Sequence, residues 1–224
     1  MTHILTIKDW ISRLLDILNV EYEAETIPLK VESFSESQQC FGNVAKKVER
    51  DGGRAHCGWL IHTDSRFIIE AERHVVWEND NLELIDVTPQ EPNVTEVIFV
   101  SDDVEDVNSC KDIDNVRLNK TNNQLVDDFI KVSETLTAIT FLGERLDDYQ
   151  VALDSDIAPY ISKYGVFKNY IFNLMCQNGD KHSPCFCGSG NPYDRCHGRG
   201  LTQMCNRELL KIKGKINNRN KKRN

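Results

Sequence analysis

The sequence contains no long uncharged apolar run, few prolines and few glycines. A helix that crosses a bilayer needs about 20 consecutive apolar residues, and no segment of the 224 residues approaches that length. The N-terminal segment also lacks the apolar core of a secretory signal, because charged side chains interrupt it at Lys8, Asp9, Arg13 and Asp16. Six prolines and twelve glycines exclude collagen-like and low-complexity architectures. We therefore expect a globular, cytoplasmic protein without a membrane span.

The eight cysteines do not have the distribution of a secreted disulfide scaffold. Cys185, Cys187 and Cys196 lie within twelve residues of one another and stand beside His197. The other cysteines are scattered singly: Cys40, Cys57, Cys110, Cys176 and Cys205. Because no secretory signal is expected and the chain is not small, we interpret the cysteines as thiols in a reducing compartment, some of them metal ligands or nucleophiles.

Acidic side chains are scarce at the C-terminal end, although the whole chain has a formal charge of −8. Residues 1–180 carry 16 Lys and Arg against 33 Asp and Glu, whereas residues 181–224 carry 11 against 2. This asymmetry predicts an acidic body with a basic end that binds a partner. The seven basic residues after Glu208 can contact RNA phosphates or an acidic protein, or they can form a disordered solubilising tail. The sequence leaves both interpretations open.

Hydrophobic periodicity predicts an α+β protein. Apolar residues at helical spacing predict helices at residues 6–19, 40–51, 122–149 and 166–176. Alternating or short apolar runs predict strands at residues 56–62, 67–69, 73–78, 82–88 and 97–100. Residues 20–36 are expected to be an extended loop and residues 101–115 an acidic connector. The heptad spacing of residues 122–149 also fits a coiled coil, but one helix packed against the body or against a neighbouring helix is the favoured interpretation.

The C-terminal cluster has the spacing of a metal site, Cys-x-Cys-x8-Cys-His, and consists of Cys185, Cys187, Cys196 and His197. Three thiolates and one imidazole supply the four tetrahedral ligands that Zn²⁺ prefers. Because protein fills every position, no site stays open for a catalytic water, and we expect a structural ion. So short a segment has almost no core, and metal binding is expected to supply its folding energy. A chance cluster is the less favoured alternative, and Fe²⁺ is a second candidate ion.

Residues 184–200 resemble the SEC-C motif, the metal-binding tail of the SecA translocation ATPase and of many small bacterial proteins. The similarity includes Gly-Ser-Gly at 188–190 and Cys-His-Gly at 196–198. In SecA this module contacts an acidic chaperone surface and the ribosome. The resemblance therefore implies that the module and the basic tail dock on an acidic protein or on the ribosome, and RNA is a further candidate partner.

A second group of residues has the order of a catalytic triad. Cys40 begins a predicted helix, whose N-terminal dipole favours the thiolate form. If residues 79–81 form a three-residue hairpin loop, His74 pairs with Asp86 across two strands, with Cβ atoms about 4.5–5.5 Å apart and a register good to about one residue. The Asp86 carboxylate can then accept the imidazole N–H and leave the other ring nitrogen for the thiol.

Each member of this group alone has a more ordinary explanation. A lone cysteine before an apolar helix face is often a small buried hydrophobe. A lone histidine on a strand is usually structural, and an aspartate ahead of Val-Thr-Pro can simply start a turn. A further alternative is a second metal site, formed by His56, Cys57 and His62 with Cys40 or His74. It ranks below the triad, because extended chain places His56 and His62 roughly 20 Å apart.

A cysteine on a helix, followed by a histidine and an aspartate on successive strands, is similar to the transglutaminase-like branch of the papain-like cysteine enzymes. Residues 72–77 and 84–89 carry the resemblance through His-x-x-Trp and Asp-Val-Thr-Pro segments. The sequence departs from the family at Trp77, which stands three residues after His74 where those enzymes often have two. The resemblance implies an α+β fold with a papain-like core that contains an antiparallel sheet, and acyl-transfer chemistry by the triad.

The leading hypothesis is a cysteine-dependent hydrolase of a peptide, isopeptide or side-chain amide. The Cys40 backbone N–H would hold the oxyanion, with Gln38 or Gln39 as the second donor. In this hypothesis residues 1–115 form the papain-like core, 116–180 a helical segment, 181–200 the zinc module and 201–224 the basic tail. The alternatives are a non-enzymatic zinc-binding adaptor and a regulatory binding protein whose acidic body mimics a polyanion.

Overall fold

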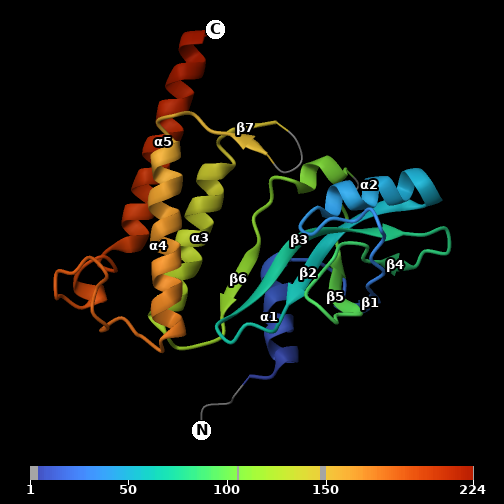
Figure 1. Ribbon diagram of the computed structural model, residues 1–224, viewed down its shortest axis with the longest axis horizontal. Helices are drawn as coiled ribbons and strands as arrows, with labels where there is room; N and C mark the ends of the chain where they lie inside the picture. The colour runs from blue at the N-terminus through green and yellow to red at the C-terminus, as the bar shows by residue number, and fades with distance from the viewer. Residues whose placement is uncertain (1–4, 105, 147–149, 224) are drawn as a thin grey trace. The chain divides into compact units, whose positions relative to one another are not determined.

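The computed structural model describes residues 5–104, 106–146 and 150–223. The chain divides into two compact units, residues 1–120 and residues 121–224. The first unit holds the main sheet and the second holds three long helices (Figure 1). No helix in the described part of the chain is long and apolar enough to cross a membrane.

The first unit is built on a six-stranded antiparallel sheet. Its strands are β1 (Glu25–Pro28), β2 (Arg54–His62), β3 (Ile68–Glu78), β4 (Leu84–Ile85), β5 (Glu96–Ser101) and β6 (Val116–Asn119). Their order is β1-β5-β2-β3-β4, and β6 pairs with the N-terminal part of β3. The expected α+β class with an antiparallel sheet is therefore confirmed, while the papain-like core stays a prediction.

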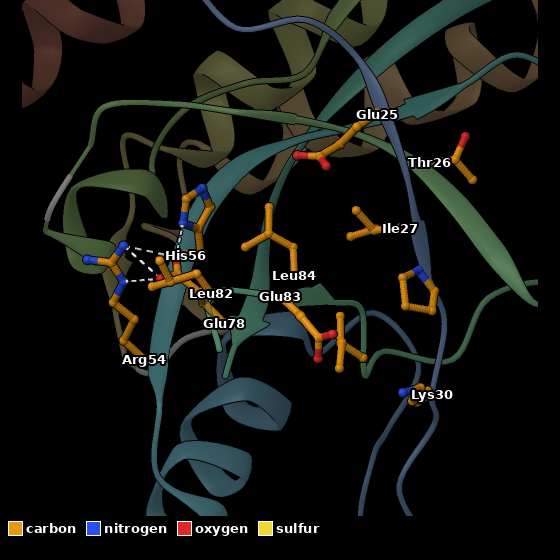
Figure 2. Close-up of a pocket in the computed structure, with 12 residues that line it drawn as sticks. Glu25, Thr26, Ile27, Lys30, Arg54, His56, Glu78, Leu82, Glu83 and Leu84 are labelled. Atoms are coloured by element: carbon orange, nitrogen blue, oxygen red, sulfur yellow. Dashed lines mark hydrogen bonds and ion pairs between the residues drawn. The ribbon is translucent and has the colours of Figure 1, made fainter. Parts of the chain in front are cut away.

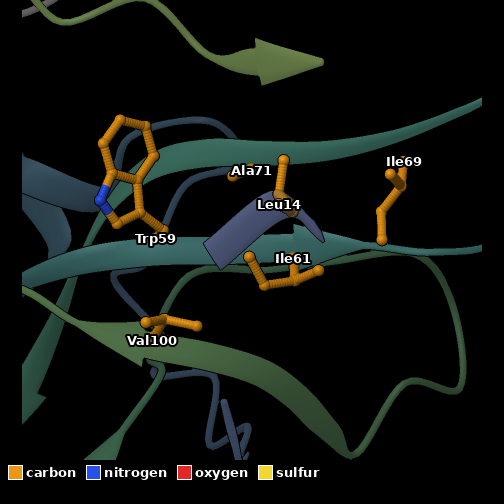
Figure 3. Packing of buried hydrophobic residues seen from close by; sticks show 6 residues of the cluster. All are labelled: Leu14, Trp59, Ile61, Ile69, Ala71 and Val100. Carbon is orange, nitrogen blue, oxygen red and sulfur yellow. The ribbon is translucent and has the colours of Figure 1, made fainter. Parts of the chain in front are cut away.

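Side-chain alternation along β2 and β3 assigns each residue to one face of the sheet. Helix α1 (Ile7–Leu18) buries Leu14 against odd-numbered residues of these strands, and Figure 3 shows this cluster: Leu14, Trp59, Ile61, Ile69, Ala71 and Val100. Helix α2 (Cys40–Asp51) packs by Val44 against Cys57 and Val75, which have the same parity. Even-numbered residues therefore face the other side, where Leu60 and Val76 pack with Phe99. This parity places His62, Glu72 and His74 on one face.

Strands β1 and β6 of the first unit were not predicted, and two of the predicted strands form a single strand. The expected strands at 67–69 and 73–78 are one continuous strand, β3. The segment 20–36 contains β1, which pairs with the distant β5. The acidic connector 101–115 contains a short 3₁₀ helix, η1 (Val107–Cys110), whose Cys110 is buried against Cys57. These elements depend on partners far along the chain, which local periodicity does not reveal.

The hairpin between β3 and β4 has a register that differs from the predicted one. The ladder pairs Glu78 with Leu84 instead of with Leu82. A hydrogen bond between Asn79 and Glu83 leaves residues 80–82 as the three-residue loop, one residue later than predicted. The expected cross-strand pairing of His74 with Asp86 is therefore wrong. The ladder ends at Ile85, and the chain leaves β3 at that point.

The Asn79 side chain explains this shift. Its Oδ1 accepts the N–H groups of Asn81 (2.9 Å) and Glu83 (3.0 Å), and the Asn79 N–H donates to the Glu83 carbonyl at 3.1 Å. Asn79 thus closes the strand pairing as an Asx turn instead of belonging to the loop. The left-handed position falls on Leu82, which has φ +63°.

Leu82→Gly is expected to raise the free energy of unfolding of the first unit by up to about 1 kcal/mol. A left-handed conformation costs an L-residue roughly 1–2 kcal/mol and costs glycine almost nothing, although glycine has more freedom to lose on folding. The Leu82 side chain is 75 % exposed, so little packing is lost. Urea unfolding measures the change. Glu83→Gly, at a position without positive φ, should destabilise; equal losses in both variants would contradict the argument.

The described part of the second unit contains three α-helices, a short 3₁₀ helix and a small two-stranded sheet. The elements are α3 (Gln124–Thr140), β7 (Glu144–Arg145), β8 (Val151–Ala152), α4 (Ala158–Cys176) and α5 (Leu201–Arg223). Helix α3 packs against both α4 and α5, as the packed-helix interpretation expects.

The boundaries of these helices differ from the predicted ones. Helix α3 ends at Thr140, and the last three residues of the predicted helix, 147–149, lie outside the described residues. A Cβ at Gly143 would stand 2.3 Å from the Val151 side chain and 2.6 Å from the Ala152 carbonyl, so β8 requires glycine there.

Helix α4 begins eight residues before the predicted start. The basic end is helical in α5, where Ile212 is buried, and its first part is not a disordered tail.

Candidate metal centre and candidate active site

The four predicted metal ligands lie in a loop between α4 and α5. The isolated bridge between Pro184 and Pro192 closes this loop, and the Cys185 N–H donates to the Asn191 carbonyl at 2.8 Å. Gly188 and Gly190 both have φ +73°, a conformation that lets the chain reverse after the first pair of ligands. The short 3₁₀ helix η2 (Tyr193–Arg195) then delivers the second pair, Cys196 and His197.

The ligand atoms converge on one point. The three Sγ atoms and one imidazole nitrogen all lie within 4.8 Å of one another. The His197 Nδ1 atom is 3.2 Å from Cys185 Sγ and 3.4 Å from Cys196 Sγ, and Cys187 Sγ is 3.5 Å from Cys196 Sγ. Tetrahedral ligands at the usual zinc distances of about 2.0–2.3 Å stand roughly 3.5–3.8 Å apart. The donor set is therefore compatible with one tetrahedrally bound metal ion.

Aromatic side chains support this loop from α4. The Phe186 ring lies 4.5 Å from the His197 ring and 3.8 Å from the Tyr170 ring, and Phe167 lies 5.9 Å from His197. Tyr193 is fully buried beside Phe167. The expectation of an almost coreless segment is therefore wrong, because the loop shares an aromatic core with α4.

Comparison with protein families agrees with the geometry. A family model described as the SEC-C motif matches residues 183–199, which contain all four ligands. The chain carries a SEC-C motif. The resemblance stated for this segment is thereby confirmed. The SEC-C motif covers only a small part of the chain, and the chain has no match among curated proteins or solved structures.

The predicted nucleophile occupies the first turn of α2. Cys40 is the first residue of the helix and is 8 % exposed, and Gln39 is its N-cap without a capping hydrogen bond from its side chain. Asn43 fixes the segment that leads into the helix. Its side chain accepts the Glu36 N–H (2.9 Å) and donates to the Glu36 carbonyl (2.8 Å) and to the Thr88 hydroxyl (3.3 Å).

His74 and Asp86 meet although they are not opposite each other in a ladder. His74 Nε2 lies 3.2 Å from Asp86 Oδ1, and both residues are buried. The Asp86 backbone pairs with the end of β1, since its N–H donates to the Pro28 carbonyl at 3.0 Å. The Asp86 carboxylate also accepts the Thr88 N–H (2.9 Å) and the Gln90 amide (3.1 Å). These bonds fix the carboxylate, which in turn orients the imidazole.

The electrostatics of His74 follow from these neighbours. Burial by itself lowers the pKa of His74, but the hydrogen bond to Asp86 and the nearby charges of Asp86 and Cys40 outweigh it, so the pKa lies well above 6.5. His74 Nδ1 is buried and has no hydrogen bond of ordinary geometry to any described residue. Because Nε2 is engaged by Asp86, Nδ1 is the ring nitrogen left for the thiol.

A cavity of about 530 Å³ adjoins this group. It is lined by three segments: Ser37, Gln38 and Cys40 before and in α2; His62, Asp64, Glu72 and His74 around β2 and β3; and Thr88, Pro89, Gln90 and Glu91 after β4. Of the two predicted oxyanion donors, Gln38 lines the cavity and Gln39 does not. Gln38 has φ +62°, a left-handed conformation next to the helix start.

The alternative second metal site is wrong, because its members lie apart. His56 contacts Glu78 and Ser101, whereas His62 contacts Glu72. Within the described ranges, the Cys, His, Asp and Glu side chains form one group with converging ligand atoms, and that group is the SEC-C cluster.

Sequence reasoning missed a second cavity, also of about 530 Å³, on the same face of the sheet (Figure 2). Glu78 is buried at its wall, and Arg54 donates two hydrogen bonds to its carboxylate, at 2.9 and 3.0 Å. His56 Nδ1 lies 2.7 Å from Glu78, and its Nε2 lies 3.0 Å from the Ser101 hydroxyl, which does not line the cavity. Burial raises the pKa of Glu78, but Arg54 and His56 lower it by more. Residues 54, 56 and 78 all have even numbers on neighbouring strands and so share one face of the sheet. This pattern could have indicated the second cavity from the sequence.

Proposed function

We propose that the first unit is a cysteine-dependent hydrolase of amide bonds, with Cys40 as nucleophile, His74 as general base and acid, and Asp86 as the residue that orients His74. The observation that supports this most is a convergence. A thiol at a helix N-terminus and an imidazole with one engaged and one open nitrogen border one cavity, and a buried carboxylate contacts the engaged nitrogen. This is the combination of nucleophile, base and orienting group that acyl transfer requires.

The chemistry follows from the roles of the three side chains. The Cys40 proton would pass to His74 Nδ1, as the raised pKa of His74 favours, and the Cys40 thiolate would then attack the substrate carbonyl carbon, so that a C–S bond forms. The imidazolium would then donate that proton to the leaving nitrogen, the C–N bond breaks and an amine departs. Water, deprotonated by His74, would attack the thioester, release the carboxylic acid and restore the thiol. Asp86 keeps the ring oriented through Nε2 in every step.

The oxyanion of these steps needs donors close to Cys40. The Cys40 N–H is among the first N–H groups of α2, which have no acceptor within the helix. It points toward the region where the helix dipole favours negative charge. Gln38, which lines the cavity, supports the second-donor role better than Gln39.

The SEC-C motif would hold a structural Zn²⁺ and serve as a docking module in this proposal. All four ligands come from protein, which fits a closed site without catalytic water. Helix α5 extends from the motif and exposes Lys211, Lys213 and Lys215 with no acid after Glu208. These charges support docking on an acidic partner, as the resemblance implies.

Alkylation of Cys40 tests the proposed function. With iodoacetamide at pH 6.5, Cys40 is expected to react about 10- to 100-fold faster than in the His74→Ala variant, because an ordinary thiol with a pKa of about 8.5 is only about 1 % thiolate at that pH. Peptide mass spectrometry reads Cys40 separately from the other cysteines, and Cys40→Ser identifies the adduct.

His56→Ala is the matched control, because it removes a histidine from the neighbouring strand that faces the other cavity. Its Cys40 should react at the wild-type rate. If Cys40 reacts as slowly as an ordinary thiol, and His74→Ala changes nothing, Cys40 is an inert buried thiol. The adaptor hypothesis would then replace the enzyme hypothesis.

A further inference from the structure

We infer that the cleft beside Cys40 selects substrates that carry a positively charged side chain next to the scissile carbonyl. This inference rests on the proposed function of Cys40. It concerns what the rest of the cavity recognises, and it names basic peptides, with lysine or arginine beside the cleaved bond, as the substrate class.

Acidic side chains line the cavity from two separate segments. Asp64 and Glu72 belong to the β2–β3 hairpin, and Glu91 belongs to the loop after Asp86. No lysine or arginine is among the described residues that line it. A cavity with walls of one charge sign concentrates ligands of the opposite sign and repels like charge.

Nearby cations offset this charge only in part. His62 Nε2 donates a hydrogen bond to the Glu72 carboxylate at 2.7 Å; this bond raises the pKa of His62, and burial opposes it. This contact offsets the negative charge of Glu72. Lys120 lies near Asp64, but its ammonium donates to the Thr63 carbonyl and does not line the cavity. His74, the second imidazole of the lining, is offset by the Asp86 carboxylate at 3.2 Å, and Glu91 stands on the opposite segment from His62 and Lys120, so the cavity keeps a negative excess.

A second observation points to a ligand in this cavity. The His74 side chain is 2 % exposed, lines the cavity and has an Nδ1 without a hydrogen bond of ordinary geometry to any described residue. A buried ring nitrogen left open is costly unless a reacting group engages it. The volume of about 530 Å³ lies within the range of ligand sites. The acidic wall therefore surrounds a place where a substrate reacts.

The charge of the whole unit acts in the same direction. Residues 1–120 carry 12 Lys and Arg against 24 Asp and Glu. This excess attracts basic peptides at long range, and the attraction falls as salt shortens the Debye length from about 10 Å at 0.1 M to 3 Å at 1 M. Recognition in the cleft would then fix the charged side chain near Glu91 and Asp64.

Peptidyl chloromethyl ketones test the inference with the full chain. Three probes differ only in the residue beside the reactive group: lysine, norleucine, which has the same carbon chain without the charge, or glutamate. The rate of the Cys40 adduct is measured by mass spectrometry. The lysine probe is expected to react at least 10-fold faster than the norleucine probe, and the glutamate probe at least 10-fold slower.

Two variants assign the preference to the cleft. Glu91→Gln and Asp64→Asn should each reduce the lysine-to-norleucine ratio about 3- to 10-fold. Glu83→Gln, which removes an exposed carboxylate from the other cavity, is the matched control and should change neither rate. In 1 M salt the lysine preference should shrink.

The outcomes separate the two proposals. Equal rates for the three probes, with fast and His74-dependent alkylation of Cys40, would overturn the substrate class and keep the enzyme. Slow alkylation of Cys40 by every probe and by iodoacetamide would overturn the proposed function itself. A lysine preference that persists in Glu91→Gln and Asp64→Asn would show that these carboxylates do not recognise the substrate, which also overturns the inference.

Discussion

Cys187→Ser is expected to lower the bound metal from one ion per chain to none. Cys187 is one of four ligands whose donor atoms lie within 4.8 Å of one another, and a serine hydroxyl replaces its thiolate poorly as a zinc ligand. Binding of structural zinc by such ligand sets contributes on the order of 10 kcal/mol to folding. Elemental analysis of the purified protein measures the stoichiometry.

The consequence for folding is expected to stay local. The first unit is compact by itself, and the three tryptophans, Trp10, Trp59 and Trp77, all lie in it. Its unfolding, followed by tryptophan fluorescence, should be unchanged in Cys187→Ser. Cys176→Ser removes a cysteine that is not a ligand and should retain one ion per chain. Wild-type protein without any transition metal, and with all SEC-C thiols freely titratable, would contradict the metal site.

Asp86→Ala is expected to lower the free energy of unfolding of the first unit by about 3–5 kcal/mol. The substitution leaves the buried His74 ring without its charged partner, and removing one member of a buried ion pair costs about this much. It also removes the acceptor of the Thr88 N–H and of the Gln90 amide. Urea unfolding followed by tryptophan fluorescence measures the loss. Asp86→Asn keeps an acceptor oxygen and should lose less.

The contribution of His74 to the free energy of unfolding is expected to change with pH in one direction. Because Asp86 and Cys40 hold the pKa of His74 above 6.5 in the folded state, protonated His74 stabilises the fold. This contribution is fully present below about pH 6.5 and is lost as the pH rises through the folded pKa. The stability difference between wild type and His74→Gln should therefore be largest near pH 6 and shrink at higher pH. A difference that grows with pH would mean that His74 is buried in its neutral form.

The sequence predicted the metal centre more completely than the rest of the molecule. Its ligands are confined to residues 185–197, so their spacing alone defines the geometry. Helices α1 and α2 were predicted for a related reason, because the amphipathic pattern of a helix is contained within the helix.

Features that depend on distant partners could not be predicted in this way. Strand β1 is short and has one buried residue, Ile27, and only its pairing with β5 makes it a strand. The hairpin loop was misplaced because Leu82 takes the left-handed position that sequence rules assign to Asn or Gly. The acidic wall of the cleft joins Asp64 with Glu91, and that proximity exists only after the sheet has formed.

The proximity of His74 and Asp86 illustrates both cases. The order of the residues suggested that they meet, and their side chains are in contact. The route differs from the predicted one, because the Asp86 backbone pairs with the end of β1 instead of with β3. When the end of a hairpin strand pairs with another strand, the register of the hairpin therefore no longer decides which side chains meet.

The hydrogen bonds of Asn43 limit how the mouth of the cleft can widen. Gln38 and Gln90 line opposite rims of the cleft, and Glu36 and Thr88 lie two residues before them. The Asn43 amide donates hydrogen bonds to both Glu36 and Thr88 and so joins the two rims. We therefore expect the rims to separate at Gln38 and Gln90, beyond the segments that Asn43 joins, before they separate at Glu36 and Thr88. The outer ends of the two rims would then move apart, while the reacting groups near Asn43 keep their spacing.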